Sequence, residues 1–219
     1  MKKGVLFDLD GTLWDACEAI ADSWNIYVQR VYPGSDIVIT AESVRGVCGK
    51  TMDEFGAILF PDLEQEARDS LAEGCCVYEV EYLKDHGGQL YPGVMEMLGK
   101  LRDMGYHLYI VSNCQDGYIE DFISWSGCAD LIEDIEDYGR TGMGKADNIR
   151  LLAERNALDC AVYVGDTQGD LDSASAAGIP FIFASYGFGS VDKEVPEAEN
   201  IYGIPEAVER VIGPAAEKD

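Results

Sequence analysis

The sequence has 219 residues, a length that suits one large domain or a core that carries a smaller second unit. Its 47% hydrophobic and 26% charged residues exclude a disordered tail and a collagen-like fibre. Sixteen Lys and Arg against 41 Asp and Glu give a net charge of -25, which repels nucleic acids and anionic lipids at long range. We therefore expect no nucleic-acid partner.

The sequence carries no signal for a membrane or for disulfide bonds. Asp8 and Asp10 interrupt the apolar run near the start, and no later window reaches the roughly 18 apolar residues of a spanning helix. The seven cysteines are odd in number, scattered and without a CxxC pair, which favours free thiols. We expect a cytoplasmic protein without a membrane partner, either a monomer or a homodimer.

The first predicted element is a buried strand over residues 4–8, an apolar run that ends in a carboxylate. The block that follows, residues 15–89, shows helical periodicity and no convincing strand. Its first helix is indicated by apolar residues at helical spacing, which are Ala19, Ile20, Trp24, Tyr27, Val28 and Val31. A second long helical pattern runs from Asp62 to His86. We interpret this block as a helical insertion after the first strand.

Strands and helices alternate after the Tyr91-Pro92-Gly93 turn. The predicted strands are 107–111, 161–165 and 180–184, and the predicted helices are 93–105, 116–127, 145–158 and 171–178, with a last short helix at 205–212. This alternation is typical of an α/β fold with a parallel sheet.

Polar side chains cluster at the ends of these strands. They are Asp8, Asp10, Ser112, Asn113, Asp166 and Asp170. Lys145 begins the helix that comes before the predicted strand 161–165, and Asp166 and Asp170 follow that strand. The carboxyl ends of parallel strands share one edge of the sheet, so we expect these groups to converge there. Four carboxylates at one place repel each other unless a cation holds them, and oxygen ligands favour Mg²⁺. Such a site can bind a phosphoryl group, and an aspartate can attack its phosphorus.

Some of these residues also have structural interpretations. Ser112 and Asn113 could cap the helix predicted from Asp116, and Asp170 could be a carboxylate that the dipole of a helix N-terminus stabilises. A GKT sequence at residues 49–51 invites a P-loop interpretation, but Val44 stands where that motif requires glycine. The two histidines lie outside any motif, so histidine-based nucleophilic catalysis is not expected.

Four segments together carry a resemblance to a known family. FDLDGT (7–12), VSN (111–113), Lys145 and GDTQGD (165–170) match, in order and approximate spacing, the four motifs of the haloacid dehalogenase-like superfamily. The sequence therefore resembles that superfamily along its whole length. The resemblance implies a Rossmann-like core and a helical cap inserted after the first motif.

The resemblance also implies domain bounds and a branch. The core would comprise residues 1–14 and 90–219, and the cap would comprise residues 15–89. The first motif, with aspartate at position 10, resembles that of the phosphatase branch of the superfamily. The segments YPGV at 91–94 and YGFG at 186–189 look most like those of phosphoglycolate-phosphatase-type members.

Roles follow from the resemblance residue by residue. Asp8 would be the nucleophile, and Asp10 the general acid and then the base for the hydrolytic water. Phosphate would be bound by Ser112, Asn113 and Lys145. Mg²⁺ would be held by the Asp8 carboxylate, the Asp10 backbone carbonyl, Asp166 and Asp170, the last directly or through water. One departure is Ala146, because many members have proline after the lysine of this motif.

The resulting expectation is a Mg²⁺-dependent phosphatase that hydrolyses a small phosphorylated metabolite, phosphoglycolate-like or a sugar phosphate, through an aspartyl-phosphate. A sugar phosphomutase of the same superfamily and a non-catalytic phosphate-binding protein are the alternatives. The aromatic residues Trp14, Trp24 and Tyr27 are interpreted as packing residues. Three residues of the helical insertion are further candidates for substrate contact, and the alternative is that they have no functional role. They are Arg45, Gly46 and Lys50.

Overall fold

The fold is built on one sheet of parallel strands. The computed structural model describes residues 1–50 and 52–215, so Thr51 of the GKT sequence and residues 216–219 of the expected core lie outside the described residues. The strands run in the order β5-β4-β1-β6-β7-β8, and every neighbouring pair is parallel. Their bounds are β1 (Lys3–Phe7), β4 (His107–Ser112), β5 (Ile132–Asp137), β6 (Cys160–Gly165), β7 (Phe181–Ala184) and β8 (Glu197–Ala198). The predicted α/β fold with a Rossmann-like parallel sheet is confirmed.

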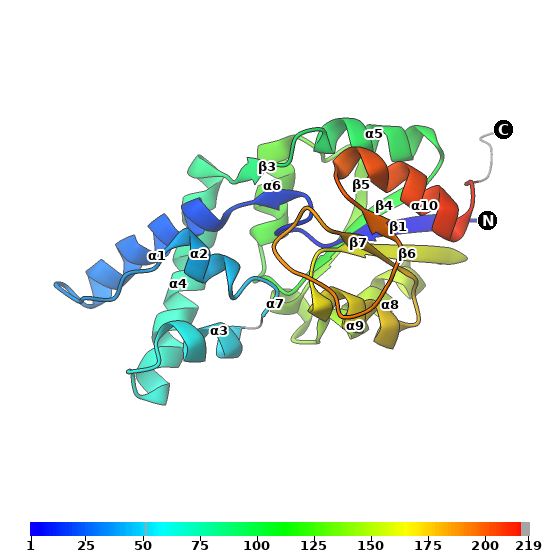
Figure 1. Ribbon diagram of the computed structural model, residues 1–219. Helices are drawn as coiled ribbons and strands as arrows, with labels where there is room; N and C mark the ends of the chain where they lie inside the picture. Colours follow the sequence, from blue (N-terminus) through cyan, green and yellow to red (C-terminus); the bar gives the residue numbers. More distant parts are fainter. Residues whose placement is uncertain (51, 216–219) are drawn as a thin grey trace.

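Helices cover both faces of this sheet (Figure 1). The helices α5 (Val94–Asp103) and α10 (Ile204–Ile212) pack on one face, and α8 (Lys145–Arg155) and α9 (Gln168–Ala177) pack on the other. Successive strand residues point to opposite faces, so Val5 and Leu6 belong to different apolar clusters. The strands are apolar on both faces because both faces are covered.

A helical unit lies beside the sheet, at the left of Figure 1. It consists of α1 (Cys17–Val31), α2 (Ala41–Arg45), α3 (Met52–Leu59) and α4 (Gln65–His86). The first and the last of these helices pack along each other, and the Trp24 ring of α1 stacks on Phe55 of α3 with 4.9 Å between ring centroids. Trp14, at the entrance to the unit, is fully buried and meets Tyr118 and Phe122 edge to face. These contacts agree with the interpretation of the two tryptophans as packing residues.

The helical unit is joined to the sheet by a short two-stranded ribbon. The strands β2 (Trp14–Asp15) and β3 (Gln89–Leu90) pair antiparallel where the chain leaves the core and returns to it. The prediction of no strand within 15–89 is therefore wrong at its two ends. A two-residue strand is too short to produce an alternating pattern in the sequence.

Further elements also differ from the sequence-based prediction. The strand β5 was not predicted, because its IEDIED sequence carries a charge at four of six positions. The helix α6 (Tyr118–Ser126) begins after Gly117, whose φ of 93° is left-handed, so Ser112 and Asn113 do not cap it. The helix α4 begins at Gln65 and not at Asp62. Two short elements, α7 (Tyr138–Thr141) and η1 (Ile201–Gly203), complete the described fold.

Within residues 1–50 and 52–215, no helix combines the length and the apolar character needed to cross a bilayer.

Candidate active site

The predicted polar residues lie at the carboxyl edge of the sheet, around its central strand. Asp8 follows β1 directly, Ser112 is the last residue of β4, and Asp166 follows β6. The chain adds β4 and β5 on one side of β1 and then β6 to β8 on the other side. The crevice at β1 is therefore the point where strand order reverses, which is where open α/β sheets bind ligands.

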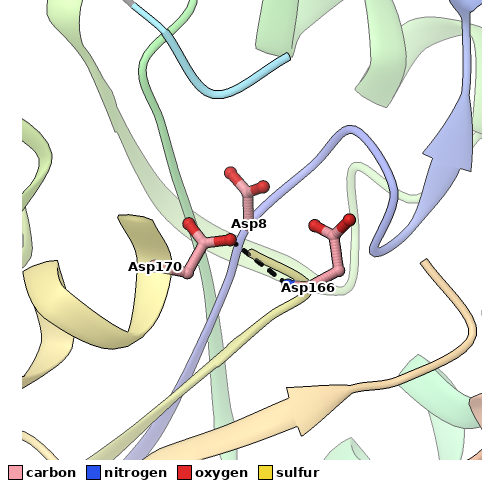
Figure 2. Close-up of side chains that lie close together, drawn as sticks. All are labelled: Asp8, Asp166 and Asp170. Carbon is pink, nitrogen blue, oxygen red and sulfur yellow. Dashed lines mark hydrogen bonds between the residues drawn. The ribbon is translucent and has the colours of Figure 1, made fainter. Parts of the chain in front are cut away.

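Three buried carboxylates meet in this crevice. Figure 2 shows the side chains of Asp8, Asp166 and Asp170 gathered there, and each offers an oxygen that lies within 4.8 Å of the other two. Lys145, only 4% exposed, donates from Nζ to Asp8 Oδ1 at 2.8 Å and to Asp170 Oδ1 at 2.6 Å. One ammonium group thus faces three carboxylates, and the cluster keeps an excess of negative charge when they are ionised.

Asp170 is a carboxylate in the first turn of α9, as one interpretation of the sequence has it, and it also pairs with Lys145, whereas its role as a metal ligand stays a prediction. Its Oδ2 accepts from the Thr167 backbone N–H at 3.0 Å, and its own backbone N–H donates to the Thr167 hydroxyl oxygen at 3.2 Å, and these two bonds form the capping box of α9. Its Oδ1 accepts from Lys145. The helix therefore begins at Gln168, before the predicted Leu171, because this cap satisfies its first backbone N–H groups.

Asp166 is oriented by the loops on either side of it. Its Oδ2 accepts from the Phe188 backbone N–H at 2.7 Å, and the Thr12 hydroxyl lies 3.3 Å from its Oδ1. Gly11 has a φ of 82°, and a β-carbon at this position would overlap the Asp166 carboxylate. The glycine of the DGT sequence is thus required by both backbone conformation and space.

Asp10 lies apart from the three-carboxylate cluster and has its own partner. The Tyr118 hydroxyl donates to Asp10 Oδ1 at 2.8 Å, which links the loop after β1 to the start of α6. Burial raises the pKa of Asp10 to about 8, and the Tyr118 hydrogen bond only partly opposes this. This shift favours the protonated form of Asp10, which is the state that a general acid needs.

Burial also controls the protonation of the cluster itself. It raises the pKa of Asp8 to about 6, helped by Asp170 and opposed by Lys145, and it raises the pKa of Asp166 to about 8. Burial alone would lower the pKa of Lys145, but the carboxylates of Asp170 and Asp8 outweigh it and raise that pKa well above its usual range. The lysine is therefore firmly charged, and it favours the ionised form of Asp8.

The donor set fits a hard divalent cation. The three carboxylates offer oxygen atoms only, they are buried, and Lys145 balances only part of their charge. Asp166 has no ion pair with any lysine, arginine or histidine of the described residues. The cluster is therefore able to hold a metal ion, with Asp8, Asp166 and Asp170 as side-chain ligands, whereas a contribution from the Asp10 carbonyl stays a prediction.

A cavity of about 280 Å³ extends from Asp10 and Ser112 into the helical unit. Asn113 lines it and donates from Nδ2 to the Gly49 carbonyl at 2.9 Å, which joins the end of β4 to the loop after α2. Lys50 also lines this cavity. Arg45 does not line it but pairs with Asp15 at 2.7 Å and lines a separate cavity, and Gly46 ends α2.

Sequence reasoning did not single out Glu79, a carboxyl on α4 that is 3% exposed and lines the same cavity. Trp24 donates from Nε1 to its Oε2 at 2.6 Å, and Gln115 donates from Nε2 to its Oε1 at 2.9 Å. Burial raises its pKa to about 7, although both hydrogen bonds oppose the shift. An acidic residue in a helix with many exposed acids gives no sign in the sequence that it faces inward.

This pKa makes the stability of the fold depend on pH. The folded state binds the Glu79 proton more tightly than the unfolded state, so the stabilisation is complete below pH 4.5 and is lost as pH rises through about 7. We expect the free energy of unfolding of wild type, relative to Glu79→Gln, to fall by roughly 3 kcal/mol across that range. Urea unfolding of both proteins measures it, with the exposed Glu81→Gln on the same helix as control. A difference that does not change with pH would contradict the buried carboxyl.

Comparisons with known proteins decide the family. A sequence model described as haloacid dehalogenase-like hydrolase matches residues 5–184, which is most of the chain. The chain belongs to the haloacid dehalogenase-like hydrolases. The predicted resemblance to this family is thereby confirmed.

Similar proteins indicate which branch of the family this chain resembles. A phosphoglycolate phosphatase of Xanthomonas campestris pv. campestris is 30% identical over 197 residues, covering 85% of this chain and 84% of the relative. A phosphoglycolate phosphatase of Rhodospirillum rubrum is 28% identical over 198 residues, covering 86% of this chain and 81% of the relative. The chain is thus an enzyme of the phosphatase type, and its resemblance to the phosphoglycolate-phosphatase branch is confirmed.

Solved structures agree on the fold. A structure described as a predicted phosphatase from Clostridium acetobutylicum has a TM-score of 0.77 at 22% identity, over 96% of this chain and 99% of that one. A haloacid dehalogenase-like hydrolase from Streptococcus pneumoniae has a TM-score of 0.76 at 22% identity, over 93% of this chain and 96% of that one. This chain therefore shares the α/β fold of both solved structures.

Proposed function

We propose that this phosphatase hydrolyses small organic phosphomonoesters in a Mg²⁺-dependent reaction that passes through an aspartyl-phosphate on Asp8. The observation that carries the proposal is the pairing of two differently tuned carboxyls. Asp8 is held beside the Lys145 ammonium, whereas Asp10, two residues on, has a pKa of about 8 and a tyrosine partner. The pKa of Asp8, about 6, is lower than that of Asp10, so Asp8 ionises more readily and suits a nucleophile, whereas Asp10 suits a proton donor.

The proposed binding roles follow from position and charge. Lys145, Ser112 and Asn113 would bind the phosphoryl group, since Lys145 contacts Asp8 and the other two line the cavity together with Asp10. Mg²⁺, held by Asp8, Asp166 and Asp170 with the Asp10 carbonyl, supplies neutralisation of phosphoryl charge when bound. The buried crevice strengthens each of these interactions, because little water screens them.

The proposed reaction has two balanced steps. In the first, an Asp8 carboxylate oxygen bonds to phosphorus, the bond from phosphorus to the ester oxygen breaks, and that oxygen takes the proton of Asp10 as it leaves. In the second, Asp10 accepts a proton from water as the water oxygen bonds to phosphorus. The bond between phosphorus and Asp8 breaks, which restores the Asp8 carboxylate and releases inorganic phosphate.

The helical unit would act as a cap that limits substrate size. We propose the cap as residues 15–89 and the core as residues 1–14 and 90–219, joined by the β2–β3 ribbon. The cavity between them, of about 280 Å³, suits a compact leaving group. The phosphoglycolate phosphatases to which this chain is similar support a substrate of that size.

The two alternatives differ from this proposal in measurable ways. A sugar phosphomutase would use the same aspartates but return the phosphoryl group to a bound sugar, so it would require a bisphosphate activator. A non-catalytic phosphate-binding protein would not need a proton donor such as Asp10, whose raised pKa favours its protonated form. Phosphate release from a chromogenic phenyl ester without any activator supports the phosphatase over both.

The role of Asp10 predicts a dependence on the leaving group. We expect Asp10→Asn to lower kcat by about 10²- to 10⁴-fold for an alkyl phosphate, because the leaving alkoxide must be protonated. For a phenyl phosphate with an acidic phenol, the loss of the acid should matter far less in the phosphoryl-transfer step. Burst-phase kinetics with both esters separate this step from hydrolysis. An equal loss of the burst rate for both esters would show that Asp10 is not the acid.

A further inference from the structure

The wall of the cavity that faces Asp10 is mainly apolar. In the helical unit it is formed by Ile20 and Trp24 of α1, Val44 and Val47 around α2, and Phe55 of α3. Trp24 and Phe55 stack on each other, and both line the cavity. A leaving group that fills this space gains binding energy from an apolar body.

The polar groups of the same cavity are mostly acidic or neutral. Glu79 is buried in the wall, and each of its oxygens accepts one hydrogen bond from a neutral donor, Trp24 or Gln115. Among the residues that the structure describes, no lysine, arginine or histidine forms an ion pair with it. Lys50 is the basic residue of the described lining, and it is exposed. A buried carboxylate without a counter-ion is unfavourable, and a ligand that brings a positive charge relieves it.

The proposed reaction directs the leaving group toward Glu79. Displacement at phosphorus places the leaving oxygen opposite the attacking oxygen of Asp8 and within reach of Asp10, which must protonate it. Asp10 and Glu79 both line this one cavity. The remainder of the alcohol would therefore lie in the cavity that the Glu79 carboxyl lines.

Building on the proposed phosphatase function, we propose that Glu79 selects phosphomonoesters whose alcohol carries a positively charged amine on a short apolar body. The ammonium group would pair with the Glu79 carboxylate and lie against the Trp24 and Phe55 rings, which also attract cations. A carboxylate in that place would face Glu79 and the acidic surroundings of Asp10. The protein would thus disfavour the two-carbon acid phosphate named in its relatives.

The test compares esters of matched size on the purified protein with Mg²⁺. The substrates are 2-aminoethyl phosphate, 2-hydroxyethyl phosphate and 2-phosphoglycolate, with a chromogenic phenyl ester as the measure of general activity. In wild type we expect kcat/KM to be highest for the amine and lowest for the acid. In Glu79→Gln the ratio of kcat/KM for the amine over the hydroxyl ester should fall by about tenfold or more. The intrinsic reactivity of each ester is the same for both proteins, so the change in this ratio isolates Glu79.

Controls separate the possible failures. Glu81→Gln removes the same charge from an exposed position of α4 and should leave the order of the esters unchanged. Should Glu79→Gln not fold, the wild-type order of the three esters alone decides, and 2-phosphoglycolate ahead of the amine would overturn the inference. Activity on the phenyl ester with an amine-to-hydroxyl ratio that is the same in wild type and Glu79→Gln would overturn the selectivity and leave the phosphatase proposal standing. Absence of turnover with every ester would overturn both.

Discussion

Asp8→Asn is expected to lower kcat for every ester by at least about 10⁴-fold, because a neutral amide oxygen is a poor nucleophile toward phosphorus. The substitution keeps the size and shape of the side chain. It also removes one member of a crowded cluster in which burial and Asp170 already raise the pKa of Asp8 to about 6. Lys145 keeps its bond to Asp170, so the fold should persist. Steady-state kinetics with a sensitive phosphate assay measures the loss.

A matched control is available on the surface. Asp103→Asn makes the same chemical change at the exposed end of α5 and should leave kcat unchanged. Circular dichroism of both variants shows whether the fold is retained. Folded Asp8→Asn protein with a substantial part of the wild-type kcat would mean that another group, or water directly, attacks phosphorus.

Removal of divalent metal is expected to abolish activity to a similar degree. Three buried carboxylates face one ammonium group, so without a cation they repel both each other and the phosphoryl group. EDTA should stop turnover and added Mg²⁺ should restore it. Ca²⁺ should inhibit, because its larger and looser coordination misplaces the attacking oxygen.

A binding measurement makes this prediction independent of turnover. Mg²⁺ should raise the melting temperature of wild type, because it binds the folded state only, and Asp166→Asn should lose most of that shift. Asp172→Asn, an exposed aspartate of the nearby helix α9, should keep it. Full activity in excess chelator would refute the metal site.

The site residues at the strand ends were predictable because each one stands next to an apolar run in the sequence. Asp8 and Asp166 each follow an apolar run directly, and a parallel sheet brings the ends of such runs to one edge. The inserted helices were predictable for a similar reason, since apolar residues at helical spacing in α1 pack against α4. The phosphate role of Ser112, Asn113 and Lys145 stays a prediction, although the structure brings Lys145 to Asp8.

What could not be predicted depends on contacts between distant segments. Tyr118 reaches Asp10 across 108 positions, and Gln115 and Trp24 converge on Glu79 from different elements. Nothing in the local pattern of α4 separates Glu79 from the exposed acids beside it. The sequence does not indicate the strand β5, because four of its six residues are acidic. The strand can form because Arg155 pairs with Asp134 and Glu136.

The most direct test of the mechanism is to trap the covalent intermediate. Wild-type protein is mixed with excess substrate and Mg²⁺, quenched in acid within one turnover, digested and analysed by mass spectrometry. Our account predicts one added phosphoryl group on the peptide that contains Asp8, absent from Asp8→Asn and enriched in Asp10→Asn with a phenyl ester, since the base for hydrolysis is then missing. A phosphoryl group on a different residue, or rapid turnover with no phosphorylated peptide at any quench time, would contradict it.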